Sequence, residues 1–349
     1  MKILISSDGV HAHYFQRLSW LRAFNAVGIN AQFWDCKNMS AFDAFDLHEP
    51  DVFLGQSYNL TSDLVKCIYE RPHLKVGLRA GDWGDFERDP TLNVLYATEQ
   101  EIELLKKLKE ETGKPDFVHI HYDQEAVNQT HSNYSKIGID AKSVIMCGDV
   151  QAYLGAQYDE SLACDIGFVG GYWPHKGIII DQFLTPLCHP VDKYNIKIFG
   201  NQPWHVNQYC GFLQDNKVKD LFVSAKICPN LSEPHAHHYG FDINERCFKI
   251  LCAGGFCISD NITSIKKIFK GNGVIFAEGP QDFREKIDYY LANEGERQEL
   301  ALRGQQFLLE NHTNFHRISQ ILSYLGYEQE SANIVEGWNK TRREINVQR

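Results

Sequence analysis

The sequence predicts an α/β protein with two parallel-sheet domains. Short apolar runs of strand length recur along the chain, amphipathic helical stretches separate them, and this alternation starts twice. The length of 349 residues agrees, because a usual domain has roughly 150 residues. We therefore expect two open sheets, each covered by helices.

In the first half, apolar runs predict buried strands at residues 2–6, 31–34, 51–55, 74–78, 94–97, 117–120 and 143–146. Between the first two runs, residues 14–27 place Phe15, Leu18 and Phe24 on one helical stripe. Residues 98–112 predict a second helix, which ends at Gly113. This half is predicted to form a domain of residues 1–160.

The alternation begins again after a polar stretch at residues 156–163. Strands are predicted at residues 165–169, 195–199, 221–223, 256–259 and 273–276, and helices at 178–188, 244–253, 281–293, 296–310 and 314–325. These elements predict a second domain of residues 161–325, followed by a helical tail at 326–349. Two such sheets in sequence predict a ligand site in a cleft between the domains, at the carboxyl ends of the strands.

Composition excludes several classes of protein. The 35 Lys and Arg against 45 Asp and Glu give a net charge of −10, so a nucleic-acid partner is disfavoured. The ten cysteines include no C-x-x-C pair, which predicts reduced thiols. No apolar stretch approaches the roughly 20 residues of a membrane span, and the first residues do not form a secretory signal. We therefore expect a cytoplasmic protein.

Two motifs in the second half could bind a phosphate. The strand at 165–169 runs into the turn Gly170-Gly171, where backbone N–H groups could approach an anion, although a tight strand-to-helix turn explains it equally well. Arg246 and Lys249 stand three apart in a predicted helix and could hold a diphosphate. A solvated cationic face is the alternative, and the small-residue turn after Ala253 favours close approach by a ligand or backbone.

Residues 165–312 resemble the carboxy-terminal domain of the glycosyltransferase group 1 superfamily, most closely its spore-maturation-protein-like branch. The resemblance is carried by DIGFVG at 165–170, NERCFK at 244–249, AGG at 253–255 and HT at 312–313. It implies a GT-B enzyme with two Rossmann-like domains. The second domain would hold most of a nucleotide sugar, the first would approach an acceptor, and no metal or other cofactor would be needed.

Transferred to this chain, the resemblance makes Gly170, Gly171 and Arg246 binders of the diphosphate. It also implies that Gly254 and Gly255 admit the ligand at the helix start, and that Asn230 is a further candidate. One residue departs from the family pattern, because Lys249 stands where an acidic residue usually binds the ribose hydroxyls. Lysine cannot accept hydrogen bonds, so Glu245 becomes the candidate acceptor.

The first half should supply the acceptor side. Asp82 and Asp85 follow the predicted strand at 74–78, and a carboxylate there could deprotonate an acceptor hydroxyl in an inverting transfer. Asp82 is the first choice as base, and a loop with helix-capping aspartates is the alternative. In chain order this place also resembles the base-bearing strand end of phage DNA β-glucosyltransferase. Gly9 and His11, in the loop after the first strand, are candidates for the donor sugar, and their contacts would favour retention.

No metal site is predicted, because the run His235-Ala236-His237-His238 has no Cys or carboxylate partner at ligand spacing. The predicted function is the transfer of a sugar from a nucleoside diphosphate sugar to a hydroxyl acceptor. One alternative is a phage-type DNA glycosyltransferase acting on a hydroxylated base. Another, favoured by Lys249, is a nucleotide-sugar-binding protein that has lost turnover.

Overall fold

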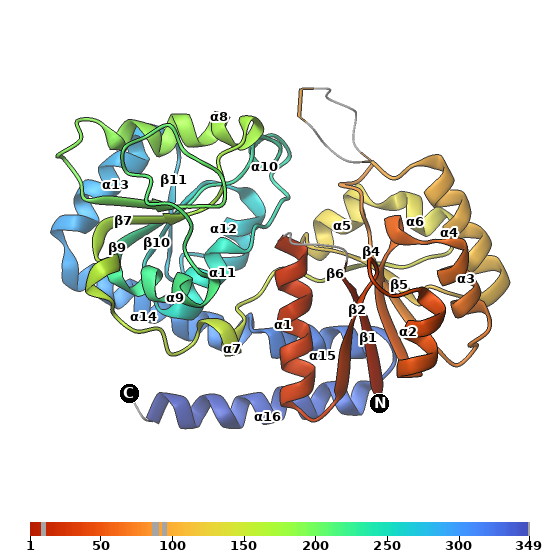
Figure 1. Ribbon diagram of the computed structural model, residues 1–349. Helices are drawn as coiled ribbons and strands as arrows, with labels where there is room; N and C mark the ends of the chain where they lie inside the picture. Colours follow the sequence, from red (N-terminus) through yellow and green to blue (C-terminus); the bar gives the residue numbers. More distant parts are fainter. Residues whose placement is uncertain (8–11, 86–90, 93–95, 348–349) are drawn as a thin grey trace. The chain divides into compact units, whose positions relative to one another are not determined.

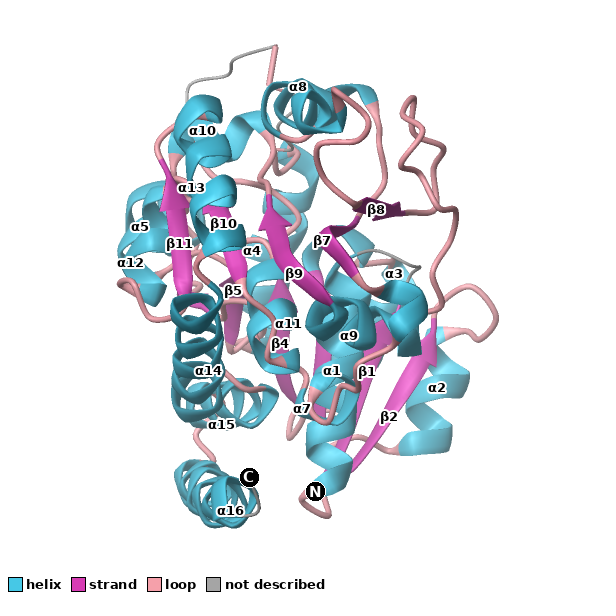
Figure 2. Ribbon diagram, turned by 90° about the vertical axis from the view of Figure 1, so that its left-hand side faces the viewer, coloured by secondary structure: helices cyan, strands magenta, loops and turns pink. Residues whose placement is uncertain are grey.

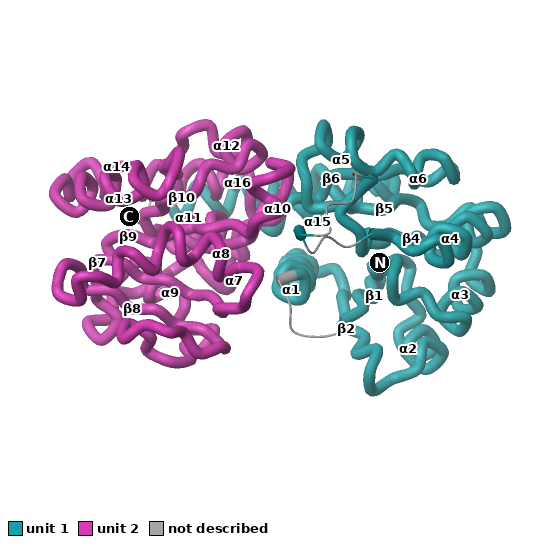
Figure 3. The backbone as a smooth tube through the Cα atoms, turned by 90° about the horizontal axis from the view of Figure 1, so that it is seen from above, with its two compact units in different colours: residues 1–145, 314–349 teal, residues 146–313 magenta. Residues whose placement is uncertain are grey.

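The structure is a computed structural model that describes residues 1–7, 12–85, 91–92 and 96–347. The chain divides into two compact units, coloured separately in Figure 3. Unit 1 comprises Met1–Ile145 and Asn314–Arg349, and unit 2 comprises Met146–Thr313. Each unit contains one parallel sheet with helices, so the predicted α/β class is confirmed.

Unit 1 has a six-stranded sheet in the order β2-β1-β3-β4-β5-β6, with all pairs parallel. The strands are β1 (Lys2–Ser7), β2 (Asn30–Asp35), β3 (Val52–Gln56), β4 (Lys75–Arg79), β5 (Phe117–Ile120) and β6 (Ala141–Ser143) (Figure 1). Strand β3 is buried along its whole length, as expected for a parallel strand covered on both faces. The carboxyl ends of the strands therefore share one edge.

The helices of unit 1 are α1 (Ala12–Ala26), α2 (Ala41–His48), α3 (Ser62–Tyr69), α4 (Glu99–Thr112), α5 (Gln124–Thr130), α6 (Ser132–Lys136), α15 (Asn314–Tyr324) and α16 (Glu328–Val347). Helix α4 begins and ends as its sequence predicts. The Thr98 side chain caps its first turn, and Gly113 ends it with a φ of 73°.

The last two helices return to the first unit. Ile318, Ile321 and Leu322 of α15 are fully buried in the same core as Ile3 and Trp20. Helix α16 packs on α15, and the Phe315 ring stacks on Trp338 with centroids 4.9 Å apart. The structural division therefore differs from the predicted boundaries near 160 and 325, because the apolar stripe of α15 is buried against α1.

Unit 2 has a five-stranded parallel sheet in the order β11-β10-β9-β7-β8 (Figure 2). Its strands are β7 (Cys164–Val169), β8 (Ile196–Phe199), β9 (Ala225–Asn230), β10 (Cys257–Asp260) and β11 (Val274–Ala277). Its helices are α7 (Val150–Tyr153), α8 (Pro174–Phe183), α9 (Asp215–Ser224), α10 (Pro234–Tyr239), α11 (Arg246–Ala253), α12 (Thr263–Phe269), α13 (Pro280–Ala292) and α14 (Glu294–Asn311).

Counted within each unit, the first five strands have the same order, 2-1-3-4-5. In such sheets strand 2 lies on one side of strand 1 and the later strands lie on the other side. The place between strands 1 and 3 is called the switch point, and ligands bind there beyond the carboxyl ends of the strands. The switch point lies between β1 and β3 in unit 1 and between β7 and β9 in unit 2. A ligand is therefore expected at the carboxyl edge of each sheet, next to its switch point.

Two predicted strands differ from the structure. Residues 221–223 lie in α9, because Val218, Leu221 and Phe222 form its buried face and the strand starts only at Ala225. Residues 94 and 95 of the run at 94–97 lie outside the described residues, and residues 96 and 97 are not strand. In the described part of the chain, no helix combines the length and the apolar character needed to cross a bilayer.

Candidate functional site

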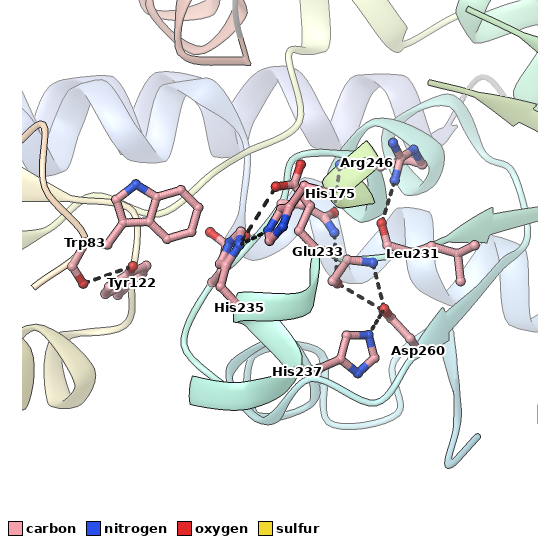
Figure 4. Close-up of polar contacts among 12 residues, drawn as sticks. Trp83, Tyr122, His175, Leu231, Glu233, His235, His237, Arg246 and Asp260 are labelled. Carbon is pink, nitrogen blue, oxygen red and sulfur yellow. Dashed lines mark hydrogen bonds and ion pairs between the residues drawn. The ribbon is translucent and has the colours of Figure 1, made fainter. Parts of the chain in front are cut away.

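Arg246 lies at the switch point of unit 2. It is the first residue of α11, and its side chain reaches the ends of both β7 and β9. Its Nε–H donates to the Val169 carbonyl at 3.2 Å, and its Nη1 donates to the Leu231 carbonyl at 3.2 Å (Figure 4). A longer contact of 3.5 Å joins Nη1 to the Asn230 amide oxygen. The guanidinium is therefore fixed between the two strand ends.

The charge of Arg246 is held without a carboxylate partner. Its hydrogen-bond acceptors are two backbone carbonyls and one amide oxygen, and among the described residues no ion pair joins it to an acid. Its guanidinium lies over the Phe168 ring, 4.7 Å from the centroid. Burial lowers the pKa of Arg246, but an arginine stays protonated in proteins. The site therefore presents a fixed positive charge.

A buried cation, Lys176, lies near the partly buried Arg246. It stands in the first turn of α8, is 8% exposed, and has its ammonium 5.5 Å from the centroid of the Trp173 ring. Burial lowers the pKa of Lys176 to about 8, with a further lowering by the charge of Arg246. The sequence analysis did not name this residue, although its position directly after the glycine-rich turn was a usable signal.

The turn after β7 packs closely between Arg246 and the β8 side. The Gly170 N–H donates to the Phe199 carbonyl at 2.8 Å, and its carbonyl accepts from the Trp204 indole at 3.0 Å. A Cβ on Gly170 would lie 3.2 Å from the Arg246 guanidinium, and one on Gly171 would lie 2.4 Å from the Trp173 ring. These glycines allow the close packing around Arg246, and the N–H of Gly170 is used by the sheet.

Asn230 and Asp260 stabilise the strand ends that hold Arg246. Asn230 is fully buried and donates from Nδ2 to the Ser259 hydroxyl at 2.9 Å. The buried Asp260 carboxylate accepts from the Ser232 N–H at 2.6 Å and pairs with His237 Nε2 at 2.8 Å (Figure 4). Because Ser232 follows the carbonyl that accepts from Arg246, these contacts fix the acceptor in place. Asn230 therefore helps to position Arg246.

From the sequence, Lys249 was expected to hold a diphosphate together with Arg246, but in the structure it pairs with Glu245. Its ammonium pairs with the Glu245 carboxylate at 2.5 Å and lies 5.8 Å from the centroid of the Tyr153 ring. Glu245 stands four residues before Lys249, the spacing at which opposite charges meet on a helix. The cation that accompanies Arg246 is Lys176, and Lys249 instead holds the Glu245 carboxylate.

Gly254 and Gly255 lie at the opposite end of α11 from Arg246. Gly254 ends the helix with a φ of 95°, and a Cβ on Gly255 would lie 2.4 Å from the Phe222 carbonyl. Together with the first residues of β7 and β9 they line a groove at the amino edge of the sheet. The expectation that they admit a ligand at the helix start is therefore corrected, because α11 runs from the carboxyl edge to the amino edge.

At the carboxyl edge of unit 1, Asp82 belongs to a buried polar network. Its side chain is 1% exposed, its Oδ1 accepts from the Gly84 N–H at 3.0 Å, and its Oδ2 accepts a short hydrogen bond from the Tyr134 hydroxyl. His131 Nε2 lies 3.4 Å from Oδ1. Burial, followed by the Asp82 charge, raises the pKa of Tyr134. Both oxygens of Asp82 therefore have internal partners.

The other predicted residues of unit 1 have simpler positions. Asp85 is exposed, and its Oδ2 accepts from the Ser132 hydroxyl at 3.0 Å and from the Asn133 N–H at 2.9 Å. It thus makes capping contacts at the start of α6, which is the alternative given for this loop. The Tyr122 hydroxyl donates to the Trp83 carbonyl at 3.3 Å (Figure 4). Gly9 and His11 lie outside the described residues.

Glu101 is an acid of this network that the sequence analysis did not name. It stands in the first turn of α4, receives a hydrogen bond from Ser57, and has a partly buried side chain. Burial raises the pKa of Glu101, and the Asp82 charge raises it further. Its Oε1 accepts no hydrogen bond from any described residue. In the sequence, Thr98 and Glu101 match a helix capping box, and this motif alone accounts for a glutamate at position 101.

One group of side chains in unit 2 could hold a metal ion. His175, Glu233 and His235 each offer one ligand atom, and these atoms lie within 4.8 Å of one another. The sequence analysis found no carboxylate partner for the histidine run at 235–238. Glu233 lies only two residues before His235, and the structure adds His175 from α8.

Comparisons with solved structures identify the fold. Phage T4 β-glucosyltransferase in complex with UDP and Mn²⁺ is 13% identical with a TM-score of 0.55, covering 95% of this chain and 99% of that chain. Anabaena HepE in complex with UDP is 12% identical with a TM-score of 0.58, covering 93% and 100%. Sucrose-phosphate synthase from Thermosynechococcus elongatus is 9% identical with a TM-score of 0.54, covering 100% of both. The fold is GT-B, as predicted.

One segment of the chain also matches a known family in sequence. Residues 181–323 match the model of the family described as glycosyl transferase-like, and no curated protein sequence matches the chain. The chain therefore combines a GT-B fold with a glycosyl transferase-like segment, and this segment contains α11 with Arg246. The predicted resemblance is confirmed at this level, and the spore-maturation-protein-like branch stays a prediction.

Proposed function

We propose that this protein transfers a sugar from a nucleoside diphosphate sugar to a hydroxyl acceptor, with the diphosphate bound at the switch point of unit 2. Arg246 and Lys176 carry this proposal, because a partly buried arginine is fixed where β7 and β9 end and the charge of Arg246 acts on the buried Lys176. Such cations stabilise the negative charge that develops on a departing diphosphate. UDP is the first nucleotide to test, since two of the similar structures contain it.

Glu245 is proposed to bind the ribose. It lies immediately before Arg246, and the Lys249 ammonium at 2.5 Å holds its carboxylate. A carboxylate can accept two hydrogen bonds from neighbouring hydroxyls, whereas a lysine accepts none. In this proposal Lys249 orients the ribose acceptor, and its presence is compatible with turnover.

The acceptor side is proposed to use a carboxylate of unit 1 as general base. Asp82 was the first choice from the sequence, but both of its oxygens accept internal hydrogen bonds. Glu101 has a raised pKa and a carboxylate oxygen without a hydrogen bond from the described residues. A raised pKa suits a base that works near neutral pH. We therefore assign the base to Glu101, with Asp82 in a positioning role, and the direct displacement that follows inverts the sugar.

In the proposed reaction, side chains offset the negative charge of the departing diphosphate. The transfer itself is therefore proposed to need no metal. Arg246 can make bidentate hydrogen bonds to phosphate oxygens, and Lys176 can act as a point charge beside it. The acceptor is proposed only as a hydroxyl-bearing molecule. The net charge of −10 is the observation that disfavours DNA as that acceptor.

The test is a panel of UDP-, GDP-, dTDP-, ADP- and CMP-sugars, with release of free nucleotide and thermal stabilisation measured for each. We expect one nucleotide class to stabilise the protein and to be released slowly even with water as acceptor. Stabilisation without release would favour the binding protein that has lost turnover. No stabilisation by any member would contradict the proposal.

Arg246→Ala links that result to the site. We expect it to abolish stabilisation by the preferred nucleotide, since charge-assisted hydrogen bonds contribute roughly 1.5–3 kcal/mol each. Arg303→Ala is the matched control, because Arg303 is an exposed arginine of the same unit. Unchanged nucleotide affinity in Arg246→Ala would show that the diphosphate binds elsewhere.

A further inference from the structure

Three potential metal ligands meet where α8 and α10 begin. His175 is the second residue of α8, Glu233 is the residue before α10, and His235 is the second residue of α10. His235 is 2% exposed, whereas His175 and Glu233 are partly buried. The two imidazole rings are parallel within 2°, with centroids 5.8 Å apart. The group thus combines one buried ligand with two that solvent can reach.

The spacing of the ligand atoms fits one small cation. His175 Nε2 lies 3.5 Å from His235 Nδ1, and the Glu233 Oε2 lies 3.8 Å from the same Nδ1 (Figure 4). With metal–ligand bonds of about 2.0–2.1 Å, two ligands of a tetrahedral zinc ion are roughly 3.3–3.4 Å apart. His175 Nε2 and the Glu233 oxygen therefore lie within a few tenths of an ångström of this spacing from His235 Nδ1, and all three atoms lie within 4.8 Å of one another.

The second nitrogen of His235 faces a carboxylate. His235 Nε2 lies 3.4 Å from the Asp242 Oδ2. A carboxylate on the far nitrogen fixes the tautomer of a metal-binding histidine, so that the near nitrogen presents its lone pair. In this tautomer His235 carries its proton on Nε2 and points Nδ1 toward His175 and Glu233. Two carboxylates, Glu233 and Asp242, also offset the charge of a divalent ion.

We propose that His175 Nε2, His235 Nδ1 and the Glu233 carboxylate form a binding site for a divalent transition metal of the zinc type. Two histidines and one glutamate are a known ligand set for zinc, with water as the fourth ligand. The bound ion would connect the first turns of α8 and α10. The three ligands adjoin Lys176 but include neither Lys176 nor Arg246, so the proposal does not rest on the proposed transfer reaction.

The experiment is titration of the full-length, chelator-dialysed protein with Zn²⁺ in a calorimeter, with Co²⁺ absorption as a second readout. We expect one zinc per chain and the visible bands of tetrahedral Co²⁺. His175→Ala should lower the zinc affinity at least about 10-fold, since it removes one of three protein ligands. Asp242→Asn should lower it by about 10- to 100-fold through the orientation of His235.

His238→Ala is the matched control, because His238 is an exposed histidine of the same short helix. It should leave the affinity and the Co²⁺ spectrum unchanged. His175 is partly exposed, so its replacement should preserve the fold, and thermal unfolding of the metal-free variant checks this. Equal zinc affinity in His175→Ala and His238→Ala, or octahedral Co²⁺ in the wild type, would overturn the proposal.

Discussion

The two units share one strand order and differ in the groups that follow the strands. In unit 2, Arg246 is held at the switch point by neutral backbone and amide oxygens. In unit 1, Asp82 is held by the Tyr134 hydroxyl and the Gly84 N–H. One edge therefore presents a cation whose hydrogen-bond acceptors are neutral oxygens, and the other contains an acid whose two oxygens accept internal hydrogen bonds.

In the proposed reaction, this difference gives each half its own chemical role. A parallel sheet determines where a ligand binds, whereas the residues after each strand determine what it binds. Fixed cations such as Arg246 suit an anionic leaving group, and the raised pKa of Glu101, an acid of the same network as Asp82, suits removal of a proton. The predictions below test whether the two edges have these separate roles.

The largest effect is expected from Glu101→Gln in unit 1. Loss of a general base should lower the rate of nucleotide release by about 10²- to 10⁴-fold, with unchanged affinity for the nucleotide. The measurement is turnover with the donor that the panel identifies, together with the Kd of the free nucleotide.

Glu99→Gln is the matched control, since Glu99 is exposed in the same first turn of α4. It should leave turnover unchanged. A Glu101→Gln variant with full activity would remove the acid–base role from this edge of unit 1. A loss of nucleotide affinity equal to the loss of turnover would mean that the two edges do not have separate roles.

A smaller effect is expected from Lys176→Gln in unit 2. Removing one of the two cations should weaken UDP binding by about 10- to 100-fold, the worth of one charge-assisted hydrogen bond. Uridine has no phosphate, so its affinity should stay the same. Calorimetry with both ligands measures the difference, and Lys219→Gln serves as a control in the same unit. Equal losses for UDP and uridine would show that Lys176 contacts another part of the nucleotide.

Asp82→Asn tests the buried network of unit 1 through stability. The amide is a weaker acceptor for the Tyr134 hydroxyl and the Gly84 N–H, so the free energy of unfolding should fall by about 1–3 kcal/mol. Asp85→Asn should change it by at most about 0.5 kcal/mol, because that side chain is exposed. Urea unfolding of both variants gives the comparison. Equal effects would mean that the contacts of Asp82 add little to stability.

The sequence was sufficient to predict most of the fold, because the apolar pattern of a helix or strand lies within its own segment. Each apolar run and helical stripe records its own burial, which is why α4 and β5 fall almost where they were predicted. The return of α15 to unit 1 is a long-range event, since its apolar stripe does not show which sheet it covers. The boundary between Thr313 and Asn314 therefore could not be found from periodicity.

The candidate site was predicted only in part, for a similar reason. Arg246 was found because its helix and turn form a continuous motif. Lys176 and Glu101 come from separate segments, and their roles depend on neighbours far away in the sequence. Lys249 was paired with Arg246 because the sequence gives spacing along a helix, whereas the structure shows that Glu245 is the partner.

The smallest effect is a pH dependence that separates Glu101 from the other acids of unit 1. Burial holds its pKa above the ordinary value of 4.5, so the unfolded chain loses this proton at a lower pH than the folded chain does. As the pH rises from the unfolded to the folded pKa, the wild type therefore loses stability relative to Glu101→Gln, which does not titrate. The gap is the free energy of unfolding of the wild type minus that of Glu101→Gln. Below the unfolded pKa this gap should be constant. Above the folded pKa it should be constant again, at a value more favourable to the variant. Urea unfolding across this range measures the gap. A gap that shifts toward the wild type with rising pH would mean that Glu101 is stabilised as a carboxylate, which would make it a poor base and return Asp82 to that role.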